Sequence, residues 1–258
     1  MAAAAQSVTP APATPAVNRR TATKIRTCTT AVLAGLGAIV AIAGPCAGIA
    51  AASPGAPAAS GSTTGADLAD VLLSPAMAGA VLEANSMQLV GSSATMADSS
   101  AQVAPAQCVS AWGPGEQQSY AGSGYTGVQT QVLANAGGAG PTHVVNQTVV
   151  SFPASADAKQ YLTRAAASWV DCANRDIDYK EASGDHKPWT LGKPAIDPKK
   201  TVIEVTQAAK DGSSACERAI TMKTNIVIDV LTCTAGADPT GQGVSLAETI
   251  VGNMPYSI

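Results

Sequence analysis

Two cysteines placed symmetrically about a short turn constrain this chain more than any other feature of its sequence. The stretch Ala215–Thr234 (ACERAITMKTNIVIDVLTCT) holds two β-rich runs on either side of a polar turn at Lys223–Asn225. In an antiparallel hairpin centred just after Thr224, residues whose numbers sum to 449 face each other, as Cys216 and Cys233 do. Directly opposed residues have Cβ atoms about 4.5–5.5 Å apart, which suits a disulfide. We therefore predict this bond, with free, buried cysteines as the alternative.

The composition makes such covalent links useful and excludes one class of function. Hydrophobic residues make up 46% of the chain but aromatic residues only 3%, so Ala, Val, Leu and Ile must build most of the core. The net charge of −3 is uneven, because four basic residues precede the first acidic residue, Asp67. Without those four, 11 Lys and Arg stand against 18 Asp and Glu, a net charge of −7. Phosphate contacts need clustered basic residues, so we expect no nucleic-acid partner.

The N-terminal 52 residues have the pattern of an export segment. A basic cluster (Arg19, Arg20, Lys24 and Arg26) precedes the uncharged run Ala31–Ala52, which ends in Ala-Ala-Ala. This pattern predicts a disordered tail followed by a cleaved signal peptide. An uncleaved anchor through residues 31–52 is the alternative, since 22 uncharged residues can span a bilayer. Lipidation at Cys46 is disfavoured by the preceding Pro45. In either form we expect an exported protein, secreted or attached to the cell envelope (periplasm or outer face of the membrane).

Residues 53–65 (SPGAPAASGSTTG) form a predicted flexible linker, and residues 66–258 the folded domain. Gly91–Ala106 and Asn174–Pro198 are predicted loops, and Cys108–Leu133 predicts short β-like pieces broken by glycine. The remaining helices and strands are predicted at Asp67–Leu73, Pro75–Ala84, His143–Phe152, Ala156–Ala173, Thr201–Gln207, the hairpin, and Val244–Val251. Strands joined mostly by hairpins or loops indicate an antiparallel sheet with helices on one side, in the α+β class.

Four cysteines lie in the predicted domain: Cys108, Cys172, Cys216 and Cys233. An even number in an exported domain is typical of two disulfides. Since the hairpin selects Cys216–Cys233, the other pair is Cys108–Cys172. A zinc site is the competing interpretation, but no CxxC spacing occurs and the chain has only two histidines. We therefore expect neither a metal nor a cofactor.

Several segments, in order, resemble a known family. They are LLSPAMAGAVL at Leu72–Leu82, the surroundings of Cys108, SFPASADAKQYL at Ser151–Leu162, WVDC at Trp169–Cys172, TVIEVTQ at Thr201–Gln207, CERAI and IVIDV within Cys216–Val230, and LAETIVGNMP at Leu246–Pro255. Together with the four cysteines they resemble the mycobacterial PknH-like extracellular sensor domain family. The resemblance implies an antiparallel sheet flanked by helices, two disulfides, and a groove for an unidentified ligand. The printed sequence contains no kinase domain, so we expect ligand capture or a partner interaction outside the cell.

Catalysis has little support in the sequence. The two histidines, His143 and His186, are each predicted to be solvated, one opening a strand and the other in a polar loop. No G-x-S-x-G or H-E-x-x-H motif occurs. A non-catalytic sensor-type domain is therefore the preferred interpretation. The alternative is an envelope hydrolase with an unrecognised site near His143 or His186.

The predicted strands carry uncharged polar residues that offer one hypothesis for a binding surface. Gln129 and Gln131 alternate on one strand, Asn146 and Thr148 on another, and Thr206 or Gln207 lies on a third. If these faces line one groove, their amides suit a polar, hydroxyl-rich ligand such as a cell-wall glycan fragment. The specific binding residues are otherwise unknown at this point.

Overall fold

The computed structural model describes residues 65–137, 140–197 and 201–254. The predicted tail, the signal peptide or anchor, and almost all of the linker lie outside the described residues. The first described element is a helix that begins at Gly65, close to the predicted start of the folded domain at residue 66.

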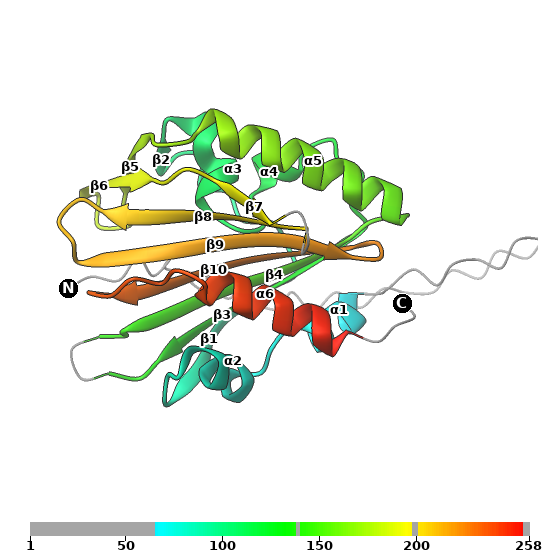
Figure 1. Cartoon of the computed structure of the whole chain (residues 1–258), viewed down its shortest axis with the longest axis horizontal. Helices are drawn as coiled ribbons and strands as arrows, with labels where there is room; N and C mark the ends of the chain where they lie inside the picture. Colours follow the sequence, from blue (N-terminus) through cyan, green and yellow to red (C-terminus); the bar gives the residue numbers. More distant parts are fainter. Residues whose placement is uncertain (1–64, 138–139, 198–200, 255–258) are drawn as a thin grey trace, which may run out of the picture. The chain divides into compact units, whose positions relative to one another are not determined.

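The centre of the domain is one ten-stranded sheet, in which all neighbouring strands run antiparallel (Figure 1). The spatial order is β1-β3-β4-β10-β9-β8-β6-β5-β2, and β7 also pairs with β8. The strands are β1 (Met87–Ser93), β2 (Val103–Ala104), β3 (Gly127–Asn135), β4 (His143–Ser151), β5 (Asp176–Lys180), β6 (His186–Leu191), β7 (Ala195–Asp197), β8 (Val202–Ala209), β9 (Ser214–Lys223) and β10 (Ile226–Ala235).

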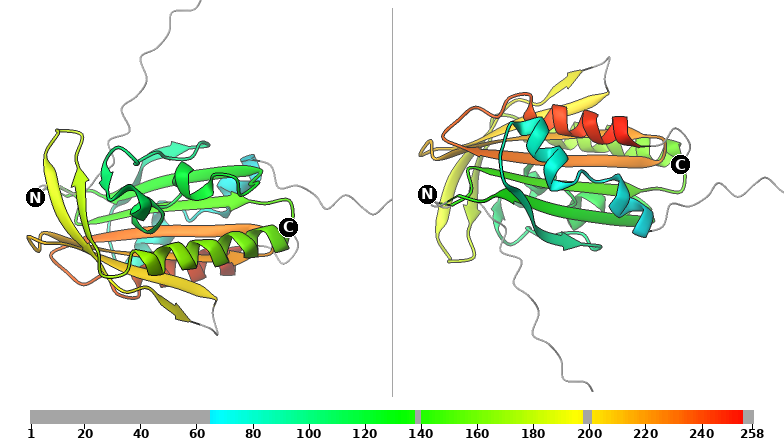
Figure 2. Two further views of the ribbon diagram at one scale, coloured as in Figure 1. Left: turned by 90° about the horizontal axis from the view of Figure 1, so that it is seen from above. Right: turned by 90° about the horizontal axis from the view of Figure 1, so that it is seen from below.

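Helices cover both faces of this sheet (Figures 1 and 2). The long helix α5 and the short α3 and α4 lie over one face, whereas α1, α2 and α6 lie over the other. Their bounds are α1 (Gly65–Val71), α2 (Pro75–Leu82), the 3-10 turn η1 (Ala106–Cys108), α3 (Val109–Trp112), α4 (Gln117–Tyr120), α5 (Ser155–Asp171) and α6 (Gln242–Asn253). The α+β class with a helix-flanked antiparallel sheet is confirmed. The expectation of helices on one side alone is wrong, because both sheet faces carry apolar side chains that need cover.

The central hairpin has the register that its sequence predicts. Cys216 is paired with Cys233, and the alignment continues to Lys223 opposite Ile226. The two sulfur atoms are bonded, and the Cα atoms lie 4.0 Å apart. Because side chains alternate along a strand, this register decides which residues of β9 and β10 share a sheet face.

Three predicted segments differ from the structure. The stretch from Cys108 to Tyr120 holds the short helices α3 and α4 in place of β-like pieces. Strands β5, β6 and β7 occupy most of the predicted loop at 174–198. Strand β1 and the short β2 likewise extend into the predicted loop at 91–106. In β5 only Ile177 and Tyr179 face inward, between exposed polar neighbours. Two apolar residues in a five-residue strand give a weak periodic signal, which is why the segment looks like a loop.

The two sheet faces have different cores. We call the face under α3, α4 and α5 the aromatic face, because its buried cluster contains seven of the nine aromatic residues: Trp112, Tyr120, Phe152, Tyr161, Trp169, Tyr179 and Trp189. We call the other face the aliphatic face, since its cluster is built from Leu, Val, Ile, Ala and Met alone. Both disulfides belong to the aromatic face.

Helix α6 is held to the aliphatic face at both of its ends by strand β9. The buried Glu217 carboxylate accepts hydrogen bonds from the backbone N–H groups of Gly241, Gly243 and Val244, at the helix N-terminus. Lys223 Nζ donates to the carbonyls of Val251 and Met254 at the other end, at 2.9 and 2.6 Å. The acid at the N-terminus and the base at the C-terminus both have the sign that the helix dipole favours.

Candidate functional site

A fully buried ion pair lies at the centre of the aromatic face, between β9 and β10. Arg218 Nε donates to Asp229 Oδ1 at 3.0 Å, and Nη2 donates to Oδ2 at 2.9 Å. Both side chains are 0% exposed. This two-point geometry is the strong form of an arginine–carboxylate contact. Burial alone would lower the pKa of Arg218, but the Asp229 carboxylate raises that pKa above its ordinary value.

The ion pair ties the covering segments to the sheet. Arg218 Nη1 donates to the backbone carbonyl of Ser110 in α3, and its guanidinium lies 4.6 Å from the ring centre of Trp169 in α5. Asp229 Oδ2 accepts from the Gly115 N–H at 3.2 Å and from the Tyr120 hydroxyl at 3.1 Å. Each remaining polar atom of the pair thus has a partner, which a buried charge requires.

A chain of hydroxyl groups leads from this centre toward the surface. The rings of Tyr120 and Tyr161 stack at 4.1 Å between centroids. The Tyr161 hydroxyl lies 2.9 Å from Ser119 Oγ, which in turn lies 3.3 Å from Ser110 Oγ. Burial raises the pKa of both tyrosines, and the nearby Asp229 carboxylate raises it further, so both stay protonated and able to donate.

A hollow of about 250 Å³ opens above these hydroxyls, between α5 and the α3–α4 segment. We call it the α5 cleft. All of its lining residues except Ala165 carry a polar group, and their carbon atoms supply about half of the exposed lining: Gln107, Ser110, Gln118, Ser119, Tyr161, Arg164, Ala165 and Ser168. Arg164 is exposed and is the one charged residue among these eight. The cleft therefore combines a row of hydroxyls on its floor with one cation on its rim.

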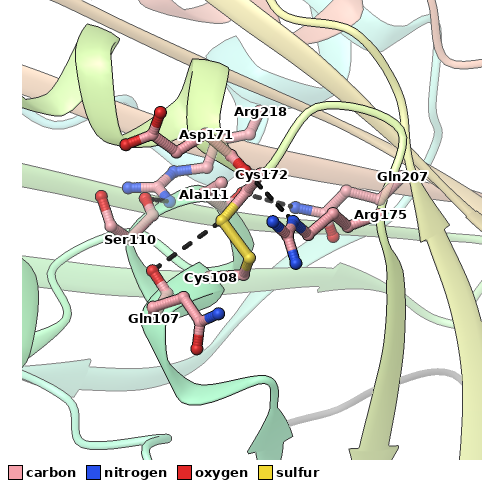
Figure 3. The surroundings of a disulfide bond; sticks show 9 residues. All are labelled: Gln107, Cys108, Ser110, Ala111, Asp171, Cys172, Arg175, Gln207 and Arg218. Atoms are coloured by element: carbon pink, nitrogen blue, oxygen red, sulfur yellow. Dashed lines mark hydrogen bonds between the residues drawn. A yellow bond between two sulfur atoms is a disulfide. The ribbon is translucent and has the colours of Figure 1, made fainter.

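The Cys108–Cys172 disulfide joins the two segments that form the α5 cleft. Cys172 ends α5 and Cys108 precedes α3, and their Cα atoms lie 5.7 Å apart. Figure 3 shows this bond beside Gln107, Ser110 and the guanidinium of Arg218. On the sheet side, Gln207 Nε2 donates to the carbonyls of Ala111 and Trp112 at 3.2 and 2.7 Å. Helix α3 is thus fixed to α5 by a covalent bond and to β8 by an amide.

A second hollow of about 170 Å³ lies at the β1 edge of the same sheet face. We call it the edge hollow. It is lined by Gly91, Ser92, Ser93, Thr95, Met96, Ala97, Pro114, Thr130, Val132 and Asn146. None of these ten described residues is ionisable, and none of them lines the α5 cleft.

The comparisons with known proteins place the chain in a family. A family model described as the PknH-like extracellular domain matches residues 63–253. The chain belongs to the PknH-like extracellular domain family.

Individual relatives agree with this membership. The chain is 29% identical over 184 residues to the serine/threonine-protein kinase PknH of Mycobacterium bovis and of Mycobacterium tuberculosis. These matches cover 71% of this chain and 29–30% of the kinases, so the chain spans under a third of the length of these relatives. The crystal structure of the extracellular domain of PknH from Mycobacterium tuberculosis matches with a TM-score of 0.68 at 26% identity, covering 75% of this chain and 97% of that one. The resemblance seen in the sequence is confirmed.

The polar residues predicted to share a groove are divided between the two faces. Gln129 and Gln131 point to the aliphatic face, whereas Asn146 and Thr148 point to the aromatic face. Gln207 also points to the aromatic face, but its amide is occupied by the carbonyls of α3, and Thr206 is exposed. Of the six, only Asn146 lines either of the two hollows described above. The single-groove hypothesis is therefore wrong for this set of residues.

Neither histidine lies at the α5 cleft or the edge hollow. His143 begins β4, where its Nδ1 lies 3.2 Å from Thr142 Oγ1. His186 begins β6 rather than lying in a loop, and its Nδ1 is 2.6 Å from Asp178 Oδ2 on an exposed hairpin. Within the described ranges, no group of three or more His, Cys, Asp or Glu side chains is placed to hold a metal ion. No helix in that same part of the chain is long and apolar enough to cross a membrane.

The central ion pair was missed in the sequence, although the hairpin register contains the signal for it. With paired numbers summing to 449, Arg218 faces Leu231, and Asp229 lies one diagonal step away on the same sheet face. Two opposite charges on one face of two apolar strands indicate a buried pair rather than a solvated edge. The α5 cleft has no comparable signal, because its lining comes from two segments, residues 107–119 and 161–168, that are distant in sequence.

Proposed function

We propose that this chain is an exported, non-catalytic, sensor-type domain that binds a small extracellular or cell-wall ligand in the α5 cleft. Family membership and two disulfides support an exported domain, secreted or held at the cell envelope. The observation that carries the choice of site is the row of pre-positioned hydroxyls on the cleft floor, which rests on a fully buried ion pair. Rigid support of this kind lowers the cost of ordering a site on binding.

The residues of the cleft favour binding over chemistry. Among the eight described lining residues, the ionisable groups are Tyr161 and Arg164. Burial raises the pKa of Tyr161, so this phenol is a poor base near neutral pH, and an arginine keeps its proton. A general base for hydrolysis needs a group that accepts a proton near the working pH. The lining offers donors and acceptors for recognition instead.

The same residues indicate the chemistry of the ligand. Three serine hydroxyls, one phenol and two amides suit a hydroxyl-rich molecule, and Arg164 on the rim suits an acidic group on it. An acidic sugar or an acidic cell-wall glycan fragment has both properties. The volume of about 250 Å³ is close to the lower end of the roughly 300–1,000 Å³ typical of small-molecule sites.

Titration of the full chain with N-acetylmuramic acid, followed by saturation-transfer NMR and calorimetry, tests this proposal. We expect saturable binding that Arg164→Gln weakens by about tenfold or more, because a hydrogen bond to a charged group contributes about 1.5–3 kcal/mol. Arg175→Gln is the matched control, since this arginine lies beyond the end of α5 and outside the cleft lining. Absence of binding, or equal loss in the two variants, would contradict the proposal.

The hydrolase alternative has one supporting observation, the short contact between His186 and Asp178. A carboxylate that orients a histidine is part of many hydrolytic sites. However, no hydroxyl or thiol among the described residues is hydrogen-bonded to the His186 ring. Hydrolysis of ester or glycan substrates that disappears on His186→Ala or His143→Ala would favour this alternative over a non-catalytic role.

A further inference from the structure

The edge hollow contains a buried polar group without a partner. Asn146 is 8% exposed, and its Oδ1 atom has no hydrogen-bond donor within reach among the described residues. A buried acceptor left unsatisfied costs roughly 1–3 kcal/mol. Native proteins have few such groups, and each calls for an explanation. Asn146 also lines a hollow, so a ligand that places a hydrogen-bond donor next to its Oδ1 atom would explain why this acceptor has no partner in the protein.

The hydroxyls around the hollow are already engaged with one another. Ser93 Oγ and Thr95 Oγ1 lie 3.0 Å apart, and Ser93 Oγ also accepts from the Thr95 N–H. Thr130 Oγ1 lies 2.8 Å from Thr148 Oγ1 on the neighbouring strand. A hydroxyl that has given its proton to a neighbour keeps only acceptor capacity. One hydroxyl of each pair keeps its proton, as does Ser92 Oγ, which accepts from Gln129 Nε2 at 2.9 Å. The hollow therefore offers both acceptors and donors and suits a ligand group that can do both.

The walls restrict the ligand further. With no ionisable residue in the lining, the hollow has nothing to neutralise a charged ligand, and burying an unpaired charge is costly. Met96, Pro114 and Val132 form an apolar wall, which suits C–H groups. The volume of about 170 Å³ is below the roughly 300 Å³ at which drug-sized sites begin. These limits describe a neutral, hydroxyl-bearing molecule no larger than a single sugar ring.

Strand β1 leaves the hollow accessible at the edge of the sheet. Among the strands that the structure describes, β1 pairs only with β3, and its register shifts between Leu89 and Gly91. Such a bulge bends the strand locally and is common beside binding sites. Gly91, directly after the shift, is part of the lining. The bend thus lies where the hollow meets the edge strand.

We propose that the edge hollow is a second binding site, for a small neutral polyol or single sugar, in which Asn146 is the residue that recognises a ligand hydroxyl or amide N–H. The carboxamide of Asn146 both accepts and donates, which matches a hydroxyl group. Because the edge hollow and the α5 cleft share no lining residue, this site does not depend on the function proposed for the cleft.

The test is NMR titration of the full, exported chain with N-acetylglucosamine and glycerol, with acetate as the charged comparison. We expect saturable shifts of the Asn146 side-chain amide and of the backbone N–H groups of Ser93 and Met96, and no such shifts with acetate. Asn146→Leu has nearly the same shape but no polar atoms. It should weaken binding by about fivefold, the factor for one lost hydrogen bond between neutral groups. Asn135→Leu is the matched control, at the far end of β3 and outside the lining.

Thermal unfolding of the same variants separates a binding role from a structural one. If Asn146 Oδ1 is unpartnered in the free protein, Asn146→Leu should leave the melting temperature unchanged or raise it. A hollow filled only by ordered water that bonds to Asn146 predicts a lower melting temperature and no saturable shifts, which would overturn the proposal. The proposal would also be overturned if acetate bound in place of N-acetylglucosamine and glycerol, or if these neutral probes bound equally well to the Asn146→Leu variant. Retained binding at the α5 cleft in any of these cases would leave the proposed function intact.

Discussion

The aromatic and aliphatic faces of the sheet achieve burial in different ways. The aliphatic face fills its space with branched side chains, and its buried polar side chains include Gln147, whose amide bonds to the N–H and carbonyl of Leu73 at 2.9 and 2.7 Å. The aromatic face instead combines large rings with two disulfides, a buried ion pair and both hollows. On the first face, side-chain shape fills the core and hydrogen bonds from Gln147, Glu217 and Lys223 hold the covering segments. The second face adds a buried ion pair and two covalent bonds. Both of the binding sites that we propose lie on the second face.

The largest expected effect comes from breaking the ion pair. Asp229→Leu leaves Arg218 buried without its anion, which typically costs about 3–5 kcal/mol of unfolding free energy. Arg218→Met combined with Asp229→Leu should recover most of this loss, because no buried charge remains. Denaturant unfolding of the single and double variants measures both. A double variant no more stable than the single would show that the pair itself, rather than an orphaned charge, dominates.

Ile228→Ala is the matched change on the aliphatic face. Ile228 adjoins Asp229 on β10 but points the other way and is fully buried. Its truncation should cost about 2–5 kcal/mol through the cavity that it leaves. Here the loss depends on volume, so Ile228→Val should cost only about 0.5–1.5 kcal/mol. The comparison is confirmed if the loss of stability at Ile228 grows with the volume removed, while the loss at Asp229 is recovered by also replacing Arg218.

Removal of each disulfide should affect stability by different amounts. Chain-entropy estimates give about 4 kcal/mol for Cys108–Cys172, with a sequence separation of 64, and about 3 kcal/mol for Cys216–Cys233, with a separation of 17. Paired Cys→Ala variants, compared by denaturant unfolding, measure this difference. Ligand binding in the α5 cleft should weaken only when Cys108–Cys172 is removed, since this disulfide joins the two walls of the cleft.

If removal of either disulfide changes binding by the same amount, the ion pair and not the Cys108–Cys172 disulfide holds the cleft together.

The smallest expected effect is a pH dependence within the cover of the aromatic face. Burial raises the pKa of Glu116 above its usual 4.5, although Ser99 donates to both carboxylate oxygens. The folded state therefore binds this proton more tightly than the unfolded state, and stability falls as pH rises from 4.5 through the folded pKa. Glu116→Gln should flatten that part of the pH–stability curve.

The control for this prediction is Asp98, an exposed neighbour whose pKa is shifted down where that of Glu116 is shifted up. Hydrogen bonds from Ser100 lower the pKa of Asp98 below 3.8, so its contribution is present above that pH and is lost only in stronger acid. Asp98→Asn should keep most of the slope above pH 4.5 and move it only slightly toward lower pH, because the Asp98 charge is the smallest of the influences that shift the pKa of Glu116. If both substitutions flatten the same region of the pH–stability curve, the slope there comes from the net charge of the domain and not from the buried Glu116 carboxyl.

Local patterns in the sequence predict the hairpin and the long helix but not the sites. The hairpin register follows from cysteine symmetry about one turn, and α5 from an apolar stripe of period near 3.6. The face of Asn146 relative to Gln131 depends instead on the β3–β4 register, which pairs Gln131 with Gln147 and so separates it from Asn146. A shift by one residue would reverse this. The 136–142 connection is rich in Gly and contains Pro141, so the sequence marks it as a loop, but a seven-residue loop does not fix the register of the strands that it joins.

Because Glu217 and Lys223 of β9 bind the two ends of α6, the length of this helix must match the distance between these two residues along the strand. From Glu217 to Lys223 an extended strand advances about 20 Å, and the twelve residues of α6 rise about 18 Å. Six residue steps along the strand and the twelve residues of the helix thus cover nearly the same distance. One residue more or fewer in α6 would turn its far end by about 100° and take it off one of its two anchors. Insertions in this domain are therefore best tolerated in its loops, and α6 behaves as a segment of fixed length.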